Sequence, residues 1–157
     1  MARNENEIRV VASNRRARHE YEILEEFEAG LVLTGSEVKT LRGGHGSIQE
    51  AYAMVRGGEA ELIGAHVPEY PWAHARNHAP ARTRKLLLHR RELDRIHSVV
   101  REKGVTLVPL ALYFKGHLVK CSLALVRGKK LHDKRATERE REDRKDMRRA
   151  TLRTRGS

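Results

Sequence analysis

Residues 21–42 read YEILEEFEAGLVLTGSEVKTLR, and this stretch contains both periodicities on which the fold depends. Its first half has apolar side chains at the odd positions from Tyr21 to Leu33, with Glu25 as the one exception. Alternation with a period of two predicts a β-strand with one buried face, because successive side chains point to opposite sides of a strand. We expect Gly30, inside this strand, to mark a bulge or a bend.

The second half of the stretch predicts a short helix. Thr34 and Glu37 have the spacing of a capping box, in which each side chain bonds the backbone N–H of the other residue. Gly43 and Gly44 are expected to end this helix. The segment that follows resembles a phosphate-binding loop only superficially, because it follows a helix rather than a strand and lacks the Gly-Lys-Ser/Thr ending. We therefore expect a plain connection there.

Two later parts of the chain have the spacing of β-hairpins, in which two apolar runs flank a short turn. Pro109 lies within the last pair of runs, and because proline has no N–H to donate to a neighbouring strand, it is expected at an edge or a bulge. Cys121 alternates with apolar neighbours and is expected to be a small core residue. The hairpins are 51–55 with 60–67 about Gly57-Gly58, and 105–114 with 118–126 about Lys115-Gly116.

A loop and a second helix lie between the hairpins. Residues 68–85 contain three prolines together with aromatic and basic side chains, a composition that predicts a loop. From Leu93 to Val100 the apolar residues share one helix face, and Gly104 is expected to end that helix. Several short strands with inserted helices predict a mainly β fold. We expect a small antiparallel barrel, for which the oligonucleotide-binding barrel is one solution.

The composition bounds what the protein can do. The chain has 157 residues, of which 39% are hydrophobic, and its 32 Lys and Arg exceed its 21 Asp and Glu by 11. That charge makes a polyanion the first partner to consider. A single cysteine excludes an internal disulfide and a zinc site with two or more cysteines. No run reaches the roughly 20 apolar residues of a membrane span. The polar amino terminus is not a secretory signal, so a reduced cytoplasmic location is expected.

The positive charge is concentrated near the carboxy terminus. Residues 128–157 contain 12 Lys and Arg against 6 Asp and Glu, a net charge of +6, and the remaining residues contain 20 against 15, a net charge of +5. The few apolar residues of this segment could bury almost no helix face. We interpret it as a basic tail that is disordered when free and becomes helical on an anionic surface. The alternative is a solvated terminal helix with charge pairs such as Glu138 with Arg141.

The sequence contains no convincing catalytic site. His74 and His78 are four residues apart, which on a helix would place them on one side, but the nearby prolines disfavour a helix and no cysteine completes a zinc site. Exposed histidines that contact nucleic acid are the favoured interpretation, followed by plain loop residues. No serine has the surroundings of a nucleophile elbow. We therefore expect no enzyme, no cofactor and no metal.

Three basic zones are the strongest functional signal. They are the run from Arg15 to His19, the loop residues Arg82, Arg84 and Lys85, and the tail. Arg and Lys neutralise phosphates, whereas the aromatic residues that stack on unpaired bases make up only 4% of the chain. This balance favours recognition of a folded RNA by its shape and backbone.

Five motifs make the sequence similar to one known family. They are NRRARHEYEI at 14–23, FEAGLVLTGSEVKTLR at 27–42, NHAPARTRKLLLH at 77–89, VPLALYFK at 108–115 and GKKLHDKR at 128–135. With these motifs the chain resembles the SsrA-binding proteins, the bacterial partners of transfer-messenger RNA (tmRNA) in trans-translation. The resemblance implies an oligonucleotide-binding barrel that grips the transfer-RNA-like domain of tmRNA and delivers it to stalled ribosomes.

The resemblance also implies how the chain divides. We expect a flexible amino terminus at 1–13, an RNA-binding barrel at 14–127 and a basic tail at 128–157. The tail would turn helical in the empty messenger channel of a stalled ribosome, near the decoding centre, where its partner is small-subunit ribosomal RNA. Barrel and tail together would then stand in for the missing pairing between codon and anticodon.

Individual roles follow from the resemblance only where the family motifs match. Glu28 matches an acidic residue that the family uses for RNA binding, and a carboxylate can accept a hydrogen bond from a base amino group or a ribose hydroxyl. Leu87 and Lys120 match further positions on the RNA side, Leu87 as supporting packing. The other tmRNA-binding residues implied in this way are Asn14, Arg16, Arg18 and His19.

In the tail, the resemblance implies contacts with the ribosome. His132 matches a residue expected to stack on small-subunit ribosomal RNA at the decoding centre. The three residues after it match the segment that the family needs for tagging rather than for RNA capture. The implied tail set is Gly128, Lys129, Lys130, His132, Asp133, Lys134 and Arg135.

Two other functions remain open on the residues. A general RNA-binding barrel would bind folded RNA without any rescue activity, and competition between tmRNA and an unrelated structured RNA at matched salt would separate it from the first hypothesis. A metal-dependent hydrolase using His74 and His78 would carry stoichiometric metal when purified.

Overall fold

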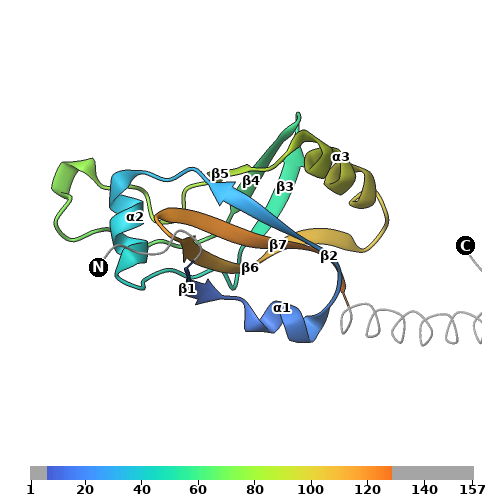
Figure 1. The fold of residues 1–157 in the computed structure, drawn as a ribbon, viewed down its shortest axis with the longest axis horizontal. Coiled ribbons are helices and arrows are strands. Elements are labelled where there is room, and N and C mark those ends of the chain that lie inside the picture. The colour runs from blue at the N-terminus through green and yellow to red at the C-terminus, as the bar shows by residue number, and fades with distance from the viewer. Residues whose placement is uncertain (1–6, 129–157) are drawn as a thin grey trace, which may run out of the picture.

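The computed structural model describes residues 7–128, whose strands close into an antiparallel barrel (Figure 1). The strands are β1 (Ile8–Ser13), β2 (Tyr21–Leu31), β3 (Tyr52–Arg56), β4 (Glu59–Ile63), β5 (Arg84–Leu87), β6 (Val105–Lys115) and β7 (Leu118–Gly128). The helices are α1 (Arg15–Glu20), α2 (Gly35–Arg42) and α3 (Arg90–Val99), and a single 3₁₀ turn, η1, spans His74–Arg76.

Strand pairing closes the barrel without parallel neighbours. The order β6-β3-β4-β5-β2-β7 returns to β6 through the β6–β7 pair, which runs the whole length of both strands. β3 contacts β6 at Leu107, and β1 pairs with the part of β6 beyond that contact. The predicted class, a mainly antiparallel β-barrel with short helices, is confirmed.

Alternate positions on the long strands fill two separate apolar clusters. On β7, Cys121 and Leu123 are fully buried inside the barrel. Ala124 and Val126, which alternate with the core residue Leu125, point outward and pack with Ala17 of α1, so α1 covers part of the outer surface. Cys121 is the small core residue that its alternation predicted, and burial raises the pKa of its thiol to about 12.

The bulge in β2 lies at Leu24, whereas Gly30 was expected to mark a bulge or a bend. Ile23 and Glu25 have consecutive partners on β7, so Leu24 is the extra residue between them. An extra residue reverses which side chains face inward. Ile23 therefore packs on the outer cluster beneath α1, whereas Phe27 faces the barrel core. Glu25, the one polar residue in the apolar alternation, directly follows the bulge at which the inward-facing side of the strand changes.

The two predicted hairpins are present, with one boundary changed. β3 and β4 are joined at Gly57-Gly58, and β6 shows the expected irregularity where its register with β7 shifts just after Pro109. The prediction that the strand after Gly57-Gly58 continues to residue 67 is wrong, because β4 ends at Ile63. The chain turns at Gly64, whose φ of +82° lies in the left-handed region that favours glycine.

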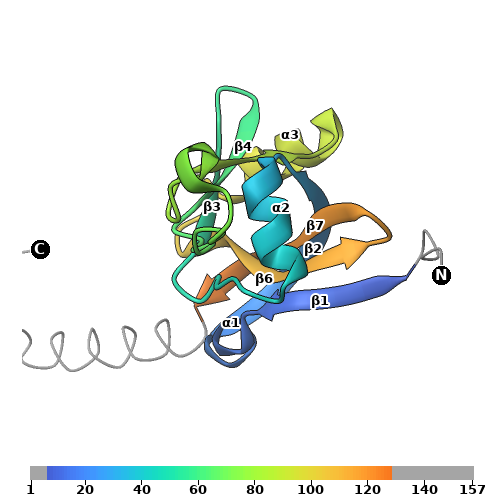
Figure 2. The same ribbon diagram turned by 90° about the vertical axis from the view of Figure 1, so that its left-hand side faces the viewer.

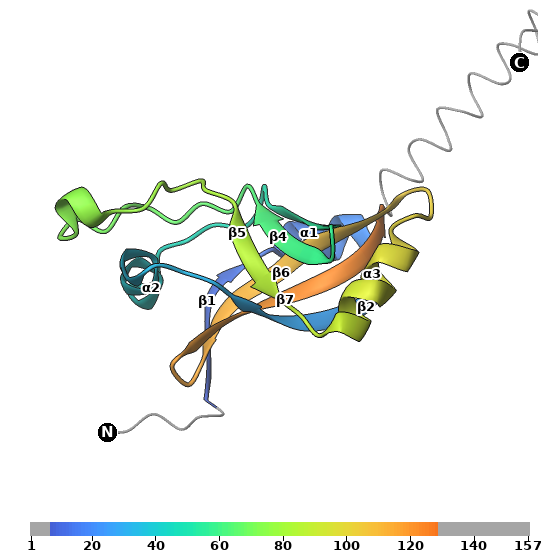
Figure 3. The same ribbon diagram turned by 90° about the horizontal axis from the view of Figure 1, so that it is seen from above.

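Two helices, α2 and α3, lie toward opposite ends of the barrel (Figure 1). α2 begins at the predicted capping box, in which the Thr34 backbone N–H donates to Glu37 Oε1 at 2.9 Å and Thr34 Oγ1 accepts from the Glu37 N–H. It lies across one end of the barrel (Figure 2), with Leu41 in the core. α3 lies toward the other end (Figures 1 and 3), anchored by Leu93 and Ile96. None of the helices within residues 7–128 has the length and apolar content to cross a membrane.

Two elements lie where none was predicted. β1 falls inside the segment 1–13 that was expected to be a flexible amino terminus, and it pairs with β6 from Ile8 opposite Lys115 to Ser13 opposite Ala111. The expected boundary after residue 13 therefore does not coincide with the edge of the sheet, because a distant strand supplies the partner for these residues. α1 follows directly and connects β1 to β2.

Candidate nucleic-acid interface

An outer face of the barrel brings together three of the predicted RNA-binding residues. Leu87 on β5 lies opposite Gly30 on β2, and Gly30 lies opposite Lys120 on β7. Residues directly opposite each other on antiparallel strands share a face. A Cβ atom on Gly30 would lie 3.3 Å from the Leu87 Cβ, so the glycine leaves the space that the leucine covers. Leu87 is 52% exposed, so it presents an apolar side chain at the surface.

Glu28, the third of these residues, lies two positions before Gly30 on the same side of β2. Its Oε2 accepts a hydrogen bond from the Tyr113 hydroxyl, and its Oε1 lies 3.2 Å from Lys115 Nζ. Tyr113 in turn lies opposite Lys120 in the β6–β7 ladder. We call the surface formed by Glu28, Leu87, Tyr113, Lys115 and Lys120 the Glu28 face.

The Glu28 carboxylate is held in its charged form. The hydrogen bond from Tyr113 lowers its pKa from the usual value, partial burial opposes that effect, and Lys115 and Lys120 lower it further. Burial, together with the same hydrogen bond, raises the pKa of Tyr113, so the hydroxyl remains a donor. The Glu28 side chain is still 41% exposed. A fixed, ionised and accessible carboxylate between two lysines can accept hydrogen bonds from a ligand whose phosphates those lysines neutralise.

Asn14, a predicted RNA-binding residue, is buried. Its Oδ1 accepts from the Ala17 N–H at 3.1 Å and so caps α1, while its Nδ2 donates to the Pro109 carbonyl at 3.1 Å. Its own backbone N–H donates to the Leu110 carbonyl at 2.8 Å. Asn14 thus attaches the start of α1 to the bulge in β6. These contacts give the side chain a positioning role for the exposed residues of the helix.

The basic residues of α1 are exposed and paired only with exposed or half-buried carboxylates. Arg16 Nε lies 2.9 Å from Glu20 Oε1, and Arg18 Nη2 lies 3.9 Å from Glu26 Oε1. His19 is also exposed. Glu26 precedes Glu28 by two residues on β2, so Arg18 extends the Glu28 face toward α1. Exposed ion pairs of this kind contribute less than about 1 kcal/mol, so a phosphate can replace their carboxylates at little cost.

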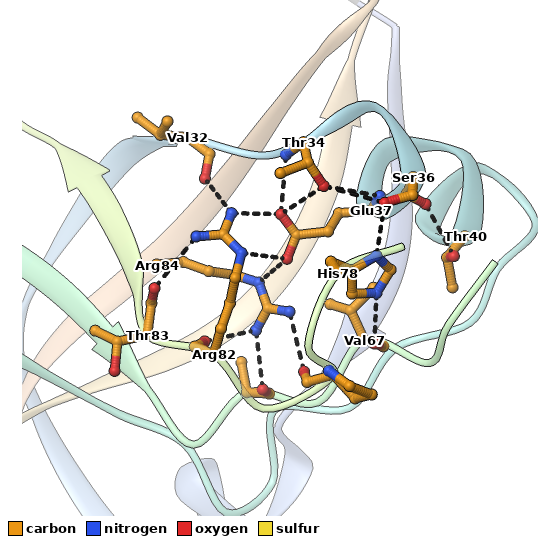
Figure 4. Close-up of polar contacts among 12 residues, drawn as sticks. Val32, Thr34, Ser36, Glu37, Thr40, Val67, His78, Arg82, Thr83 and Arg84 are labelled. Atoms are coloured by element: carbon orange, nitrogen blue, oxygen red, sulfur yellow. Dashed lines mark hydrogen bonds and ion pairs between the residues drawn. The ribbon is translucent and has the colours of Figure 1, made fainter. Parts of the chain in front are cut away.

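One residue of the second predicted basic zone, Arg84, is internal, which contradicts its expected role on the surface, whereas Arg82 is partly exposed and Lys85 is exposed. Arg84 is fully buried, and its guanidinium bonds Glu37 (Figure 4) as well as the carbonyls of Ala65 and Pro80, each at 3.0 Å. Arg82 also binds Glu37, with its Nε 3.0 Å from Oε2. Burying a charged group is costly unless it is paired with an opposite charge, so the Glu37 carboxylate and the arginines stabilise one another in the interior. These arginines bind α2 to the loop rather than phosphates.

Burial by itself would raise the pKa of Glu37. Hydrogen bonds from Arg82, from the Thr34 backbone and from Arg84 outweigh burial and lower the pKa to about 2. The carboxylate is therefore ionised throughout the physiological range. Charge counting identified the arginines in this loop. It gave no indication that Glu37, the acidic residue of the capping box, would form ion pairs with both of them.

His78 is also buried, so the expectation of an exposed, RNA-contacting histidine is wrong there. Its Nδ1 lies 2.8 Å from Ser36 Oγ and its Nε2 lies 2.8 Å from the Val67 carbonyl oxygen. His74 is exposed, in the 3₁₀ turn η1. The two histidines therefore share no site, and within residues 7–128 no three His, Cys, Asp or Glu side chains gather in a way that could hold a metal ion.

Tyr113 is a candidate residue of this face that sequence reasoning did not single out. It lies in an apolar run of β6, in which its neighbours Leu112 and Phe114 enter the barrel. The alternation between these two buried residues was the available signal that Tyr113 points outward. Of the predicted tail set, Gly128 is the last residue of β7, and residues 129–135 lie outside the described part of the chain.

The fold and this face define a class: a small antiparallel β-barrel with a cationic outer face that also presents a fixed carboxylate, a combination suited to a structured nucleic acid. The chain belongs to the SmpB protein family, whose family model matches residues 11–153.

Comparisons with individual proteins agree with the family match. The SsrA-binding protein of Microcystis aeruginosa is 50% identical over 98% of this chain and all of its own length. That of Mycobacterium sp. strain KMS is 57% identical over 80% of this chain and 75% of its own. Among solved structures, a chain from "tmRNA-SmpB: a journey to the center of the bacterial ribosome" is 47% identical, with a TM-score of 0.63 over 74% of this chain and 82% of that chain.

Proposed function

We propose that this protein is a non-catalytic factor of trans-translation that binds the transfer-RNA-like domain of tmRNA and delivers it to stalled ribosomes in the cytoplasm. Membership of the SmpB family, and relatives named for binding SsrA RNA, support the choice of ligand. The resemblance to a chain from a tmRNA-SmpB structure on the ribosome supports the second partner.

The observation that carries the proposal is the composition of the Glu28 face. Lys120 and Lys115 are suited to phosphates, which position a protein on RNA without reading its sequence. Glu28, ionised and bonded to Tyr113, is suited to a base amino group or a ribose hydroxyl, and the second of these distinguishes RNA from DNA. The exposed Leu87 adds an apolar contact at the edge of the same surface.

We assign the two halves of the positive charge to two partners. In this proposal the barrel, with Arg16, Arg18 and His19 beside the Glu28 face, holds tmRNA. The tail 128–157, with its net charge of +6, enters the empty messenger channel of the ribosome, where His132 stacks near the decoding centre. Asp133 and the two basic residues after it serve tagging rather than tmRNA capture.

Truncation tests this division. A chain that ends at Gly128 should bind tmRNA within a few-fold of the full chain, because the Glu28 face is intact, but should not support tagging of stalled polypeptides. For each chain, the affinity for tmRNA is compared with the affinity for an unrelated structured RNA. Both are measured at the same salt concentration, since phosphate contacts weaken steeply as salt increases. Loss of tmRNA affinity on truncation would disprove the division. Equal affinity of the full chain for both RNAs would instead indicate a general RNA-binding barrel.

A further inference from the structure

A pocket lies between the last turn of α2 and the start of the loop that follows β4. Its volume is about 420 Å³, within the roughly 300–1,000 Å³ typical of small-molecule sites. Its lining belongs to α2, the turn after it and the loop segment 68–71, and includes no residue of the Glu28 face. Lys39, Thr40, His45, Pro68 and Tyr70 are among the residues that line it.

The pocket pairs an aromatic ring with exposed cations. Lys39 Nζ lies 5.5 Å from the centroid of the Tyr70 ring, a cation–π geometry. Lys39 and His45 are exposed, and Arg42 lies one turn along α2 from Lys39. Glu69 is the acidic residue in the lining. A planar group can lie against Tyr70 while an attached anion meets Lys39, because the lysine side chain is long enough to turn from the ring to that anion.

The loop wall of the pocket is held in place by polar contacts. The Tyr70 N–H donates to Asn77 Oδ1 at 3.0 Å, and Asn77 Nδ2 donates to the Tyr70 carbonyl at 2.7 Å. His78 ties the same segment to α2, since its two nitrogens reach Ser36 and the carbonyls of Val67 and Pro68 (Figure 4). The backbone that carries the aromatic ring is therefore positioned before any ligand binds, which lowers the entropy cost of binding.

The loop continues with residues suited to the same ligand. Trp72, the one tryptophan of the chain, is 75% exposed directly after Pro71, which also lines the pocket. His74 and Arg76, in η1, are exposed as well. Figures 1 and 3 show η1 projecting beyond α2, away from the barrel. A large apolar ring that is exposed and contributes nothing to the core is suited to contact with a binding partner. The basic residues around it favour a partner that is a polyanion.

We propose that this pocket binds one unpaired RNA nucleotide, with its base against Tyr70, its phosphate near Lys39 and His45, and the next base on Trp72. Stacking on aromatic rings beside cations is the mode by which proteins hold single-stranded RNA. The inference rests on the proposed function in taking RNA as the partner. It adds a second RNA contact, on elements separate from the Glu28 face.

Titration of the full chain with a short single-stranded RNA tests the pocket. Binding should quench Trp72 fluorescence, which reports on this loop alone because the chain has one tryptophan. Tyr70→Ala should weaken the affinity by about 5-fold to 150-fold, the range for loss of one base stack. Tyr70→Phe, which keeps the ring, should stay within about twofold. Lys39→Ala should weaken binding, whereas the matched control Lys103→Ala, an exposed lysine far along the chain, should not.

The nucleotide could come from tmRNA or from ribosomal RNA. To distinguish these two sources, the affinities of wild type and variants are measured again with tmRNA alone and with small ribosomal subunits that lack tmRNA. A loss for Tyr70→Ala with either partner supports the inference and identifies the source of the nucleotide. Unchanged affinity of Tyr70→Ala and Lys39→Ala for the short RNA and for both partners would overturn it. Wild-type protein that binds the short RNA through Tyr70 but fails to bind tmRNA would overturn the proposed function and leave the pocket standing.

Discussion

Replacement of Glu37 by glutamine tests the buried charge network between α2 and the loop. The Glu37 side chain is fully buried, with Arg82 and Arg84 as its partners. Its pKa of about 2 lies well below the ordinary value of 4.5, because hydrogen bonds from the arginines and the Thr34 backbone outweigh the opposing effect of burial. At roughly 1.36 kcal/mol per unit, this difference corresponds to about 3 kcal/mol of stability.

The sign of the pH dependence follows from the direction of the shift. Because the folded pKa lies below the unfolded one, the stabilisation is complete at neutral pH and is lost as the pH falls from about 5 toward 2. Glu37→Gln also leaves the Arg84 charge buried without its partner, so we expect a loss of about 3–5 kcal/mol at pH 7. The difference in unfolding free energy between variant and wild type should narrow by about 2 kcal/mol at pH 3.

Urea unfolding at the two pH values measures both quantities. The matched control is Glu59→Gln, which removes a carboxylate that is 60% exposed and lies 3.3 Å from Lys85 Nζ. That exposed pair should contribute less than about 1 kcal/mol. The reasoning would be refuted if the two substitutions destabilised the protein equally, or if the cost of Glu37→Gln were the same at pH 7 and pH 3.

Three further substitutions test other parts of the structure. Glu28→Ala should weaken tmRNA binding by about 2 kcal/mol in a direct binding assay, because it removes an acceptor held by Tyr113 at the interface; unchanged affinity would contradict this. Asn14→Ala should lower the unfolding free energy by about 1 kcal/mol or more through loss of the α1 cap and of the bond to Pro109, and a neutral result in urea titration would argue against it. Gly64→Ala should cost about 1–2 kcal/mol, since its φ is +82° and a Cβ would lie 3.0 Å from the Glu50 carbonyl oxygen; no shift in the thermal midpoint would contradict the conformational argument.

Local patterns predicted much of the barrel. The capping box at Thr34 and Glu37, the turn at Gly57-Gly58 and the irregularity at Pro109 each depend on a few neighbouring residues, and the structure contains all three. The alternation in β2 predicted a strand. The position of its bulge depends on the packing of its side chains against β7 and α1, which the alternation alone does not reveal. Gly30 instead makes room for Leu87 from another strand.

Long-range contacts account for what the patterns could not predict. β1 exists because β6, about a hundred residues later in the chain, supplies its partner. Arg84 was counted with the surface charges because nothing local distinguishes it from Lys85, and only the fold brings it to Glu37. His78 was likewise assigned to the surface, although Ser36 and Val67 bind both of its nitrogens. The family resemblance singled out both Asn14 and Glu28. The contacts show that Asn14 caps α1 in the interior, whereas Glu28 is a hydrogen-bonded carboxylate at the surface.

Affinity for tmRNA of two charge-matched variants tests the central claim, that the Glu28 face binds this RNA. Lys120→Glu and Lys103→Glu change the net charge equally, but Lys120 lies between Gly30 and Tyr113 on the Glu28 face, and Lys103 is exposed in the turn after α3. At one fixed salt concentration, we expect Lys120→Glu to weaken binding by at least about tenfold and Lys103→Glu by no more than about threefold. Equal weakening by the two substitutions would mean that net charge, and not this face, binds tmRNA.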